Sequence, residues 1–171
     1  MPGDSANIYL MNTDGTNIRQ VSAPQMTVGN PFYQGTMTWS PDGTHIAYAA
    51  YFGDNWDIWT TRLADNQITR LTDNPGDDLH PDWSQDGSQI AFNSYVDGLL
   101  EIFVMDADGD NVTRLTKSDG GMVMYPRWSP DSDEIVFFIN DGEMADLFIM
   151  NANGSNIRQL TTDFAIDRVA V

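Results

Sequence analysis

Hydrophobic residues recur along the whole chain in short runs that turn-forming residues separate. Residues 46–48, 90–92 and 135–137 read Ile-Ala-Tyr, Ile-Ala-Phe and Ile-Val-Phe, with little alternation between apolar and polar positions. Short runs of this kind are typical of strands that are buried on both faces. Residues 6–11 alternate more clearly, which is typical of a half-buried strand. The pattern predicts β-strands from one end of the chain to the other.

Polar turn signals lie between these strands. Residues 12–15 read Asn-Thr-Asp-Gly, and similar turns occur at 106–109 and 151–154. Asp and Asn bond their own backbone in tight turns, and Gly supplies a positive φ. Each of these turns precedes a short strand that ends in Arg-Leu-Thr, Gln-Leu-Thr or a similar triplet. The sequence therefore predicts antiparallel hairpins.

A longer motif repeats at a fixed spacing. Trp39, Trp83 and Trp128 each begin a Trp-Ser-x-Asp turn, about 45 residues apart, and a period of that size is typical of propeller blades. We interpret the tryptophans as packing residues between blades. The structural residues that we assign to the repeat are Trp39, Asp42, Trp83, Asp86, Trp128 and Asp131.

The repeat predicts an all-β fold, a β-propeller of four-stranded antiparallel blades. We expect residues 1–171 to form a single propeller domain or propeller fragment. The expected blades are a partial one at 6–22, three complete ones at 36–72, 80–116 and 125–161, and a partial strand at 164–171.

About four blades is the lower end of what single-chain propellers contain. Three arrangements are open. The chain is a fragment of a longer propeller, its terminal strands complete one blade, or two chains close a larger ring as a homo-oligomer.

The charge balance excludes some partners. Eight Lys and Arg face 25 Asp and Glu, for a formal net charge of −17. Nucleic acids and anionic membrane surfaces are bound mainly through basic residues, so we exclude both as primary partners. No apolar run approaches the length of a membrane span, so we expect no membrane insertion. We found no Gly-x-Ser-x-Gly elbow and no phosphate-binding loop, and the expectation is a chain without catalytic residues or cofactors.

These repeats resemble the WD40-like PD40 repeats of the TolB β-propeller family. The resemblance rests on residues 39–43 (Trp-Ser-Pro-Asp-Gly), 46–48, 7–12 followed by Asp-Gly, and the Arg-Leu-Thr triplets at 70–72 and 114–116. It implies a non-catalytic scaffold that binds protein partners in the bacterial envelope, in a periplasmic or extracellular location. The chain departs from full-length TolB in lacking the N-terminal α/β domain and in having too few repeats for a six-bladed ring.

Similar repeats also form the propeller beside the peptidase domain of prolyl-oligopeptidase-like enzymes. An alternative function is therefore a substrate-gating propeller of a peptidase-like or metal-dependent hydrolase. The metal candidates are Asp77, Asp78 and His80, and the loop acids would suit Ca²⁺ because that ion prefers oxygen ligands. The simpler interpretation is that His80 is a hydrogen-bonded structural residue and that the loop acids are solvated.

Loops that join second to third strands, and those that join repeats, should emerge at one end of a propeller. The loop at 23–35 is longer than its counterparts and contains apolar residues. The candidates for partner binding at this end are Phe32, Tyr33, Asp54, Asp97 and Asp141. The basic residues Arg19, Arg70, Arg114 and Arg158 should instead fall on fourth strands, the outer edges of the blades.

Overall fold

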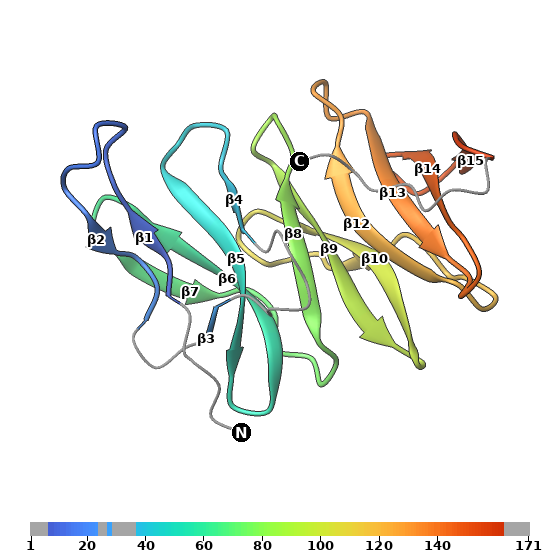
Figure 1. The fold of residues 1–171 in the computed structure, drawn as a ribbon, viewed down its shortest axis with the longest axis horizontal. Helices are drawn as coiled ribbons and strands as arrows, with labels where there is room; N and C mark the ends of the chain where they lie inside the picture. Colours follow the sequence, from blue (N-terminus) through green and yellow to red (C-terminus); the bar gives the residue numbers. More distant parts are fainter. Residues whose placement is uncertain (1–6, 24–26, 29–36, 163–171) are drawn as a thin grey trace.

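A computed structural model describes residues 7–23, 27–28 and 37–162, and every regular element among them is a β-strand. The strands form sheets that stand side by side in an arc (Figure 1). The pairing within the sheets is antiparallel, which confirms the predicted all-β architecture. No membrane-crossing helix occurs in the described part of the chain.

Four sheets follow one another along the chain, and we call them blades one to four. Blade one contains β1 (Tyr9–Leu10) and β2 (Arg19–Gln20). Blade two contains β3 (Thr27–Val28), β4 (Met37–Trp39), β5 (His45–Phe52), β6 (Asn55–Arg62) and β7 (Gln67–Arg70). Blade three contains β8 (Asp78–Trp83), β9 (Gln89–Val96), β10 (Leu99–Asp106) and β11 (Thr113–Arg114). Blade four contains β12 (Met122–Trp128), β13 (Glu134–Asn140), β14 (Ala145–Asn151) and β15 (Arg158–Gln159). The partial strand expected at 164–171 lies outside the described residues.

The Trp-Ser-x-Asp motif forms the turn between the first and second strands of a blade. In blade two, Asp42 Oδ1 accepts hydrogen bonds from the Ser40 hydroxyl at 2.6 Å and from the Thr44 backbone N–H at 2.9 Å. These donors, with Ser40 first, lower the pKa of Asp42 to about 2. Asp86 and Asp131 accept from the preceding serine in the same way, at 2.7 and 2.5 Å. The pKa values of Asp86 and Asp131 are lowered as well, so the aspartate of each repeat holds its turn as an acceptor that is ionised at neutral pH.

The first strands of blades three and four contain a bulge just before the tryptophan. The register shifts between Leu79 and Asp82 in β8, where His80 has a φ of 53°, and Tyr125 has a φ of 57° at the corresponding place in β12. In blade two the corresponding strand consists of two segments, because β3 and β4 both pair with β5. The expectation that 23–35 is entirely loop is therefore wrong at Thr27 and Val28, which hydrogen bonding to the free edge of β5 draws into the sheet.

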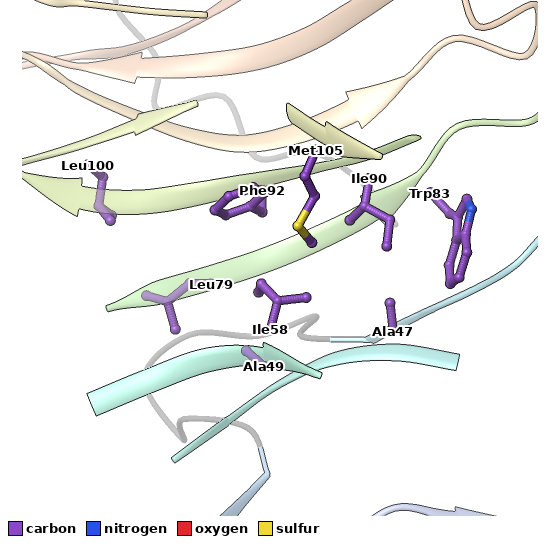
Figure 2. Close-up of a cluster of buried hydrophobic side chains, with 9 residues drawn as sticks. All are labelled: Ala47, Ala49, Ile58, Leu79, Trp83, Ile90, Phe92, Leu100 and Met105. Atoms are coloured by element: carbon purple, nitrogen blue, oxygen red, sulfur yellow. The ribbon is translucent and has the colours of Figure 1, made fainter. Parts of the chain in front are cut away.

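Blades two and three pack face to face through the hydrophobic cluster shown in Figure 2. The β5 strand contributes the small side chains Ala47 and Ala49, and Ile58 of β6 lies beside them. The large partners from blade three are Leu79, Trp83, Ile90, Phe92, Leu100 and Met105. Small residues on one blade make room for large ones on the next, and such interdigitation gives dense packing.

The other face of β5 is buried as well. Ile46, Tyr48 and Ala50 pack against Ile8 and Val21 of blade one. A second strand in the middle of the arc is therefore covered on both sides, as its unbroken apolar run predicts.

The three repeat tryptophans do not share one environment. Trp83 and Trp128 are 6% and 8% exposed and pack against the blade that precedes them, whereas Trp39 is 53% exposed. Trp83 lies beside Ala47 of β5 in this cluster (Figure 2). The described part of blade one has no counterpart of β5 that could face Trp39. For Trp39 the interpretation as a packing residue between blades therefore stays a prediction.

Candidate functional site

Three hairpin turns gather at one end of the arc, the lower end in Figure 1. They join β5 to β6, β9 to β10 and β13 to β14, and they carry Asp54, Asp97 and Asp141. Asp97 and Gly98 both have positive φ, at 54° and 88°, which is the conformation of a tight type I′ hairpin turn. The structure thus brings three of the predicted partner-binding residues to one end, which we call the loop-bearing end.

Exposed apolar side chains accompany these acids. Tyr51 and Phe52 end β5, and each rests edge-on against a tryptophan of β6 with ring centroids 5.8 Å apart. The exposed apolar residues next to the turns or at the strand ends here are Tyr51, Phe52, Tyr95, Met122 and Met144. Sequence reasoning missed them, although each stands within a few residues of a Gly-Asp, Asp-Gly or Gly-Gly turn.

The environments of two acids at the loop-bearing end differ. Asp141 Oδ1 accepts backbone hydrogen bonds from Met144 at 2.9 Å and from Glu143 at 3.0 Å, and these donors lower the pKa of Asp141. Asp97 lies 3.6 Å from Arg114 and remains 81% exposed. This end therefore combines apolar contact area with negative charge. Phe32 and Tyr33, also predicted for it, lie outside the described residues.

Asp77 and Asp78, two of the metal candidates, are engaged at the edge between blades two and three. Asp77 Oδ1 accepts the Trp56 backbone N–H at 3.0 Å, and Asp78 Oδ2 accepts the Asn74 side-chain amide at 2.5 Å. Asp78 is fully buried, and this burial raises its pKa to about 6 despite the hydrogen bonds that it accepts.

His80, the third candidate, faces blade four instead. Its Nδ1 lies 3.1 Å from Oδ1 of Asn93, and its ring centroid is 4.3 Å from that of Tyr125. Asn93 also accepts the Tyr125 N–H at 2.9 Å and donates to Val123 O at 2.7 Å. Burial lowers the pKa of His80 to about 4, which leaves the imidazole neutral. The structure thus separates His80 from the two aspartates, and no three His, Asp or Glu side chains of the described ranges form a group that could hold a metal ion.

A buried carboxylate also stands on the third strand of blades two and three, and sequence reasoning missed both. Asp57 is fully buried, and its Oδ2 lies 2.7 Å from Arg70 Nη2. In blade three Glu101 is buried likewise, 3.2 Å from Arg114. A repeated pattern in the sequence could have indicated them. In both blades the acid is followed by Ile, and the Arg of an Arg-Leu-Thr triplet stands 13 residues after the acid.

The threonine of that triplet completes the arrangement. Thr116 donates to Glu101 Oε2 at 2.5 Å and accepts the Ile102 backbone N–H at 2.9 Å. Thr72 accepts the Ile58 N–H in the same manner. In blade three these groups neutralise and satisfy one another, so they hold the third and fourth strands together. In blade two Asp57 Oδ2 is paired in the same way, but Asp57 Oδ1 is buried and accepts no hydrogen bond within the described residues.

The predicted location of the arginines on fourth strands is confirmed, since Arg19, Arg70, Arg114 and Arg158 lie in β2, β7, β11 and β15. They do not form one equivalent set. Arg70 and Arg114 bind the buried acids of their own blades, whereas Arg158 pairs with Glu134 at the surface.

Comparison with known proteins agrees with this geometry. The family model described as the TolB beta propeller domain matches residues 2–120. No significant match was found among curated protein sequences.

Solved structures show the same likeness. A putative TolB from Agrobacterium tumefaciens is 27% identical with a TM-score of 0.78, over 92% of this chain and 57% of that one. TolB from Acinetobacter baumannii is 22% identical with a TM-score of 0.75, over 91% and 37%. A structure from a study of two prolyl endopeptidases is 14% identical with a TM-score of 0.65, over 93% and 26%. The chain thus spans less than two thirds of each of these structures.

Proposed function

Because the chain belongs to the TolB beta propeller domain family, we propose that it is a non-catalytic scaffold that binds a protein partner through its loop-bearing end. The observation that carries this proposal is the set of exposed aromatic and methionine side chains beside the acidic turns. Aromatic residues and methionine are enriched where proteins bind one another, and exposed apolar residues gathered at one place mark interaction sites. The acids would steer a basic partner toward this end and repel acidic ones.

The proposal also covers the cellular location of the protein and its oligomeric state. The family resemblance favours the bacterial periplasm, and the open arc favours self-association that closes a larger ring. Light scattering after size exclusion tests the second point. A stable particle of twice 19.1 kDa supports closure by two chains, and a monomer contradicts it.

A gating propeller of a peptidase-like or metal-dependent hydrolase remains the alternative function. The likeness to the prolyl endopeptidase structure is one of fold alone. Calcium binding by the loop acids also remains a proposal, and calorimetric titration with calcium chloride tests it directly. Saturable heat that is lost on replacing Asp97 and Asp141 by Asn would support a site at the loop-bearing end.

The scaffold function is tested by using the wild-type protein and two double variants as bait in a periplasmic extract. The loop-end variant carries Tyr51→Ser and Tyr95→Ser. The control carries Val112→Ser and Ile157→Ser, at residues that are also exposed but directly precede the outer strands β11 and β15. A partner identified by mass spectrometry is then purified, and its Kd is measured with each form. We expect at least tenfold weaker binding by the loop-end variant alone. Equal binding by both variants would contradict the proposal.

A further inference from the structure

A groove opens between blades two and three at the end of the arc opposite to the loop-bearing end. Its volume is about 560 Å³, and it lies beside the turns that hold Asp42 and Asp86. These turns precede β5 and β9, whereas the turns of the loop-bearing end follow the same two strands. The groove is therefore a separate surface.

One difference between this groove and the corresponding place between blades three and four lies at position 87. There, the hydroxyl of Ser132 accepts the Asp86 backbone N–H at 3.2 Å and bridges the two blades. Gly87 occupies the position of Ser132 in the preceding repeat and has no side chain to reach Asp42. A Cβ at Gly87 would have Pro41 Cδ as its nearest neighbour, at 4.0 Å. The absence of that side chain leaves the groove open.

The close approach of the turn after the third strand is alike at the two places. A Cβ at Gly109 would lie 3.0 Å from Leu71 O, and a Cβ at Gly154 would lie 3.0 Å from Leu115 O. These turns thus pack equally closely on the preceding blade in both cases. The glycine at position 87 accounts for the missing serine bridge at the groove.

Three carboxylates surround the groove, those of Asp42, Asp86 and Asp108. Hydrogen bonds from Ser40 and Ser84 lower the pKa values of the first two, so both are charged at neutral pH. No lysine or arginine is among the described residues that line the groove.

His45 also lines the groove, and Arg62, which lies opposite His45 in the sheet, is ion-paired with Asp65 at 2.7 Å. The three carboxylates therefore have no lysine or arginine partner within the described lining of the groove.

The walls of the groove combine apolar side chains with Ser40, His45, Thr60 and Thr69. Pro41, Leu71, Trp83 and Ala107 contribute to them, and the indole N–H of Trp83 already donates to Gly87 O at 3.2 Å. A fitting ligand group thus has an aliphatic stem and a cationic head. Arginine has both, and its planar guanidinium matches carboxylate acceptors at two points at once.

We propose that the groove between blades two and three receives an arginine side chain from a partner polypeptide. The net charge of −17 would draw such a basic segment toward the protein, and the three carboxylates would fix its head group. This site does not depend on the loop-bearing end as the partner surface.

The proposal is tested by NMR titration of the ¹⁵N-labelled chain with a capped Gly-Arg-Gly peptide at physiological salt. The neutral isostere is the same peptide with citrulline in place of arginine. We expect saturable shifts at Gly87, Leu71 and the Trp83 indole, with at least tenfold weaker binding of the citrulline peptide. Equal binding of both peptides, or shifts confined to the loop-bearing end, would overturn the proposal.

Two substitutions test the location of the site, and both are made in equivalent turns of the repeat. Asp108→Asn copies Asn153 of the next repeat, and about threefold weaker binding is expected from the loss of one partly exposed ion pair. Asp14→Asn removes the same charge from the equivalent turn of blade one and should leave the Kd unchanged. Equal effects of the two variants would show general attraction to an acidic surface and would overturn the proposal.

Gly87→Ser is the most direct variant. Ser132 adopts a φ of 63°, close to the 77° of Gly87, so this turn accepts a serine. The new hydroxyl should reach the Asp42 N–H and close the groove, and the arginine shifts should disappear. Retained binding in this variant would contradict the site. The Tyr51→Ser and Tyr95→Ser changes should leave the titration unaltered, which separates failure of this site from failure of the scaffold function.

Discussion

Arg70 Nη2 lies 2.7 Å from Asp57 Oδ2, and the carboxylate is fully buried although the arginine side chain is 37% exposed. A buried charge is costly unless a partner compensates it, and here the compensation comes from the edge of the blade. Burial raises the pKa of Asp57 even beside this cation. The outer strand β7 is thus tied to the interior by one ion pair.

Replacing Arg70 by Met should destabilise the protein by about 2–3 kcal/mol, because it leaves Asp57 buried without its counter-ion. Protonation of Asp57 limits the loss. Urea unfolding at pH 7 measures the change in the free energy of unfolding.

The matched control is Arg158→Met. Arg158 pairs with Glu134 at 3.4 Å, and both side chains are well exposed. Surface ion pairs contribute about 0–1 kcal/mol, so this variant should resemble the wild type. Similar losses in the two variants would show that the buried pair has no special weight.

A second prediction compares two tryptophans at equivalent repeat positions. Trp83→Ala removes a side chain from the cluster in Figure 2 and should cost about 3–5 kcal/mol through lost burial and a residual cavity. Trp39→Ala removes a side chain that is 53% exposed and should cost less than about 1 kcal/mol. Thermal and urea unfolding of both variants measure the difference. A large loss for Trp39→Ala would mean that another surface covers it in solution.

These tryptophans show how far the sequence alone could lead. The hydrogen-bonded turn could be predicted, because Ser40, Asp42 and Thr44 lie within five residues of one another and the pattern recurs. The burial of Trp83 was readable for the same reason, once blades were expected to stack. The exposure of Trp39 was not, because it depends on which strands of the neighbouring blade are present.

The buried acids were harder to predict. Asp57 and Glu101 look like ordinary strand residues with a polar side chain, and no local pattern indicates that both are fully buried. The same applies to the groove at Gly87, since an open or bridged gap depends on contacts between residues about 45 positions apart. The local sequence pattern predicts the blades. The candidate sites depend on side-chain contacts between blades, which that pattern does not show.

The pH dependence of stability should reveal Asp78. Its pKa in the folded state is raised to about 6 from the ordinary value of 3.8, because burial disfavours the charged form. The folded state therefore binds the proton more tightly, and the stabilisation is present at low pH and lost as the pH rises through about 6. Asp78→Asn mimics the protonated carboxyl.

We expect Asp78→Asn to be more stable than the wild type at pH 8 by up to about 3 kcal/mol, the equivalent of roughly two pKa units. The difference should shrink as the pH falls toward 5. Urea unfolding between pH 5 and pH 8 measures it. A constant difference across this range would mean that Asp78 does not titrate there.

His80 should act with the opposite sign in the same range. Burial lowers its pKa to about 4 from 6.5, so the unfolded chain binds the proton more tightly than the folded one. The stabilisation from the neutral imidazole is present above pH 6.5 and is lost as the pH falls toward 4. In the wild type the contributions of His80 and Asp78 should largely cancel between pH 5 and 6.5.

His80→Gln keeps a side chain that can hydrogen-bond to Asn93 and removes the titration of residue 80. The stability of this variant should therefore fall as the pH rises through 6. The slope of the unfolding free energy against pH in the single variants and in the double variant with Asp78→Asn tests this directly. Slopes of equal sign in the two single variants would contradict the assignment of opposing groups.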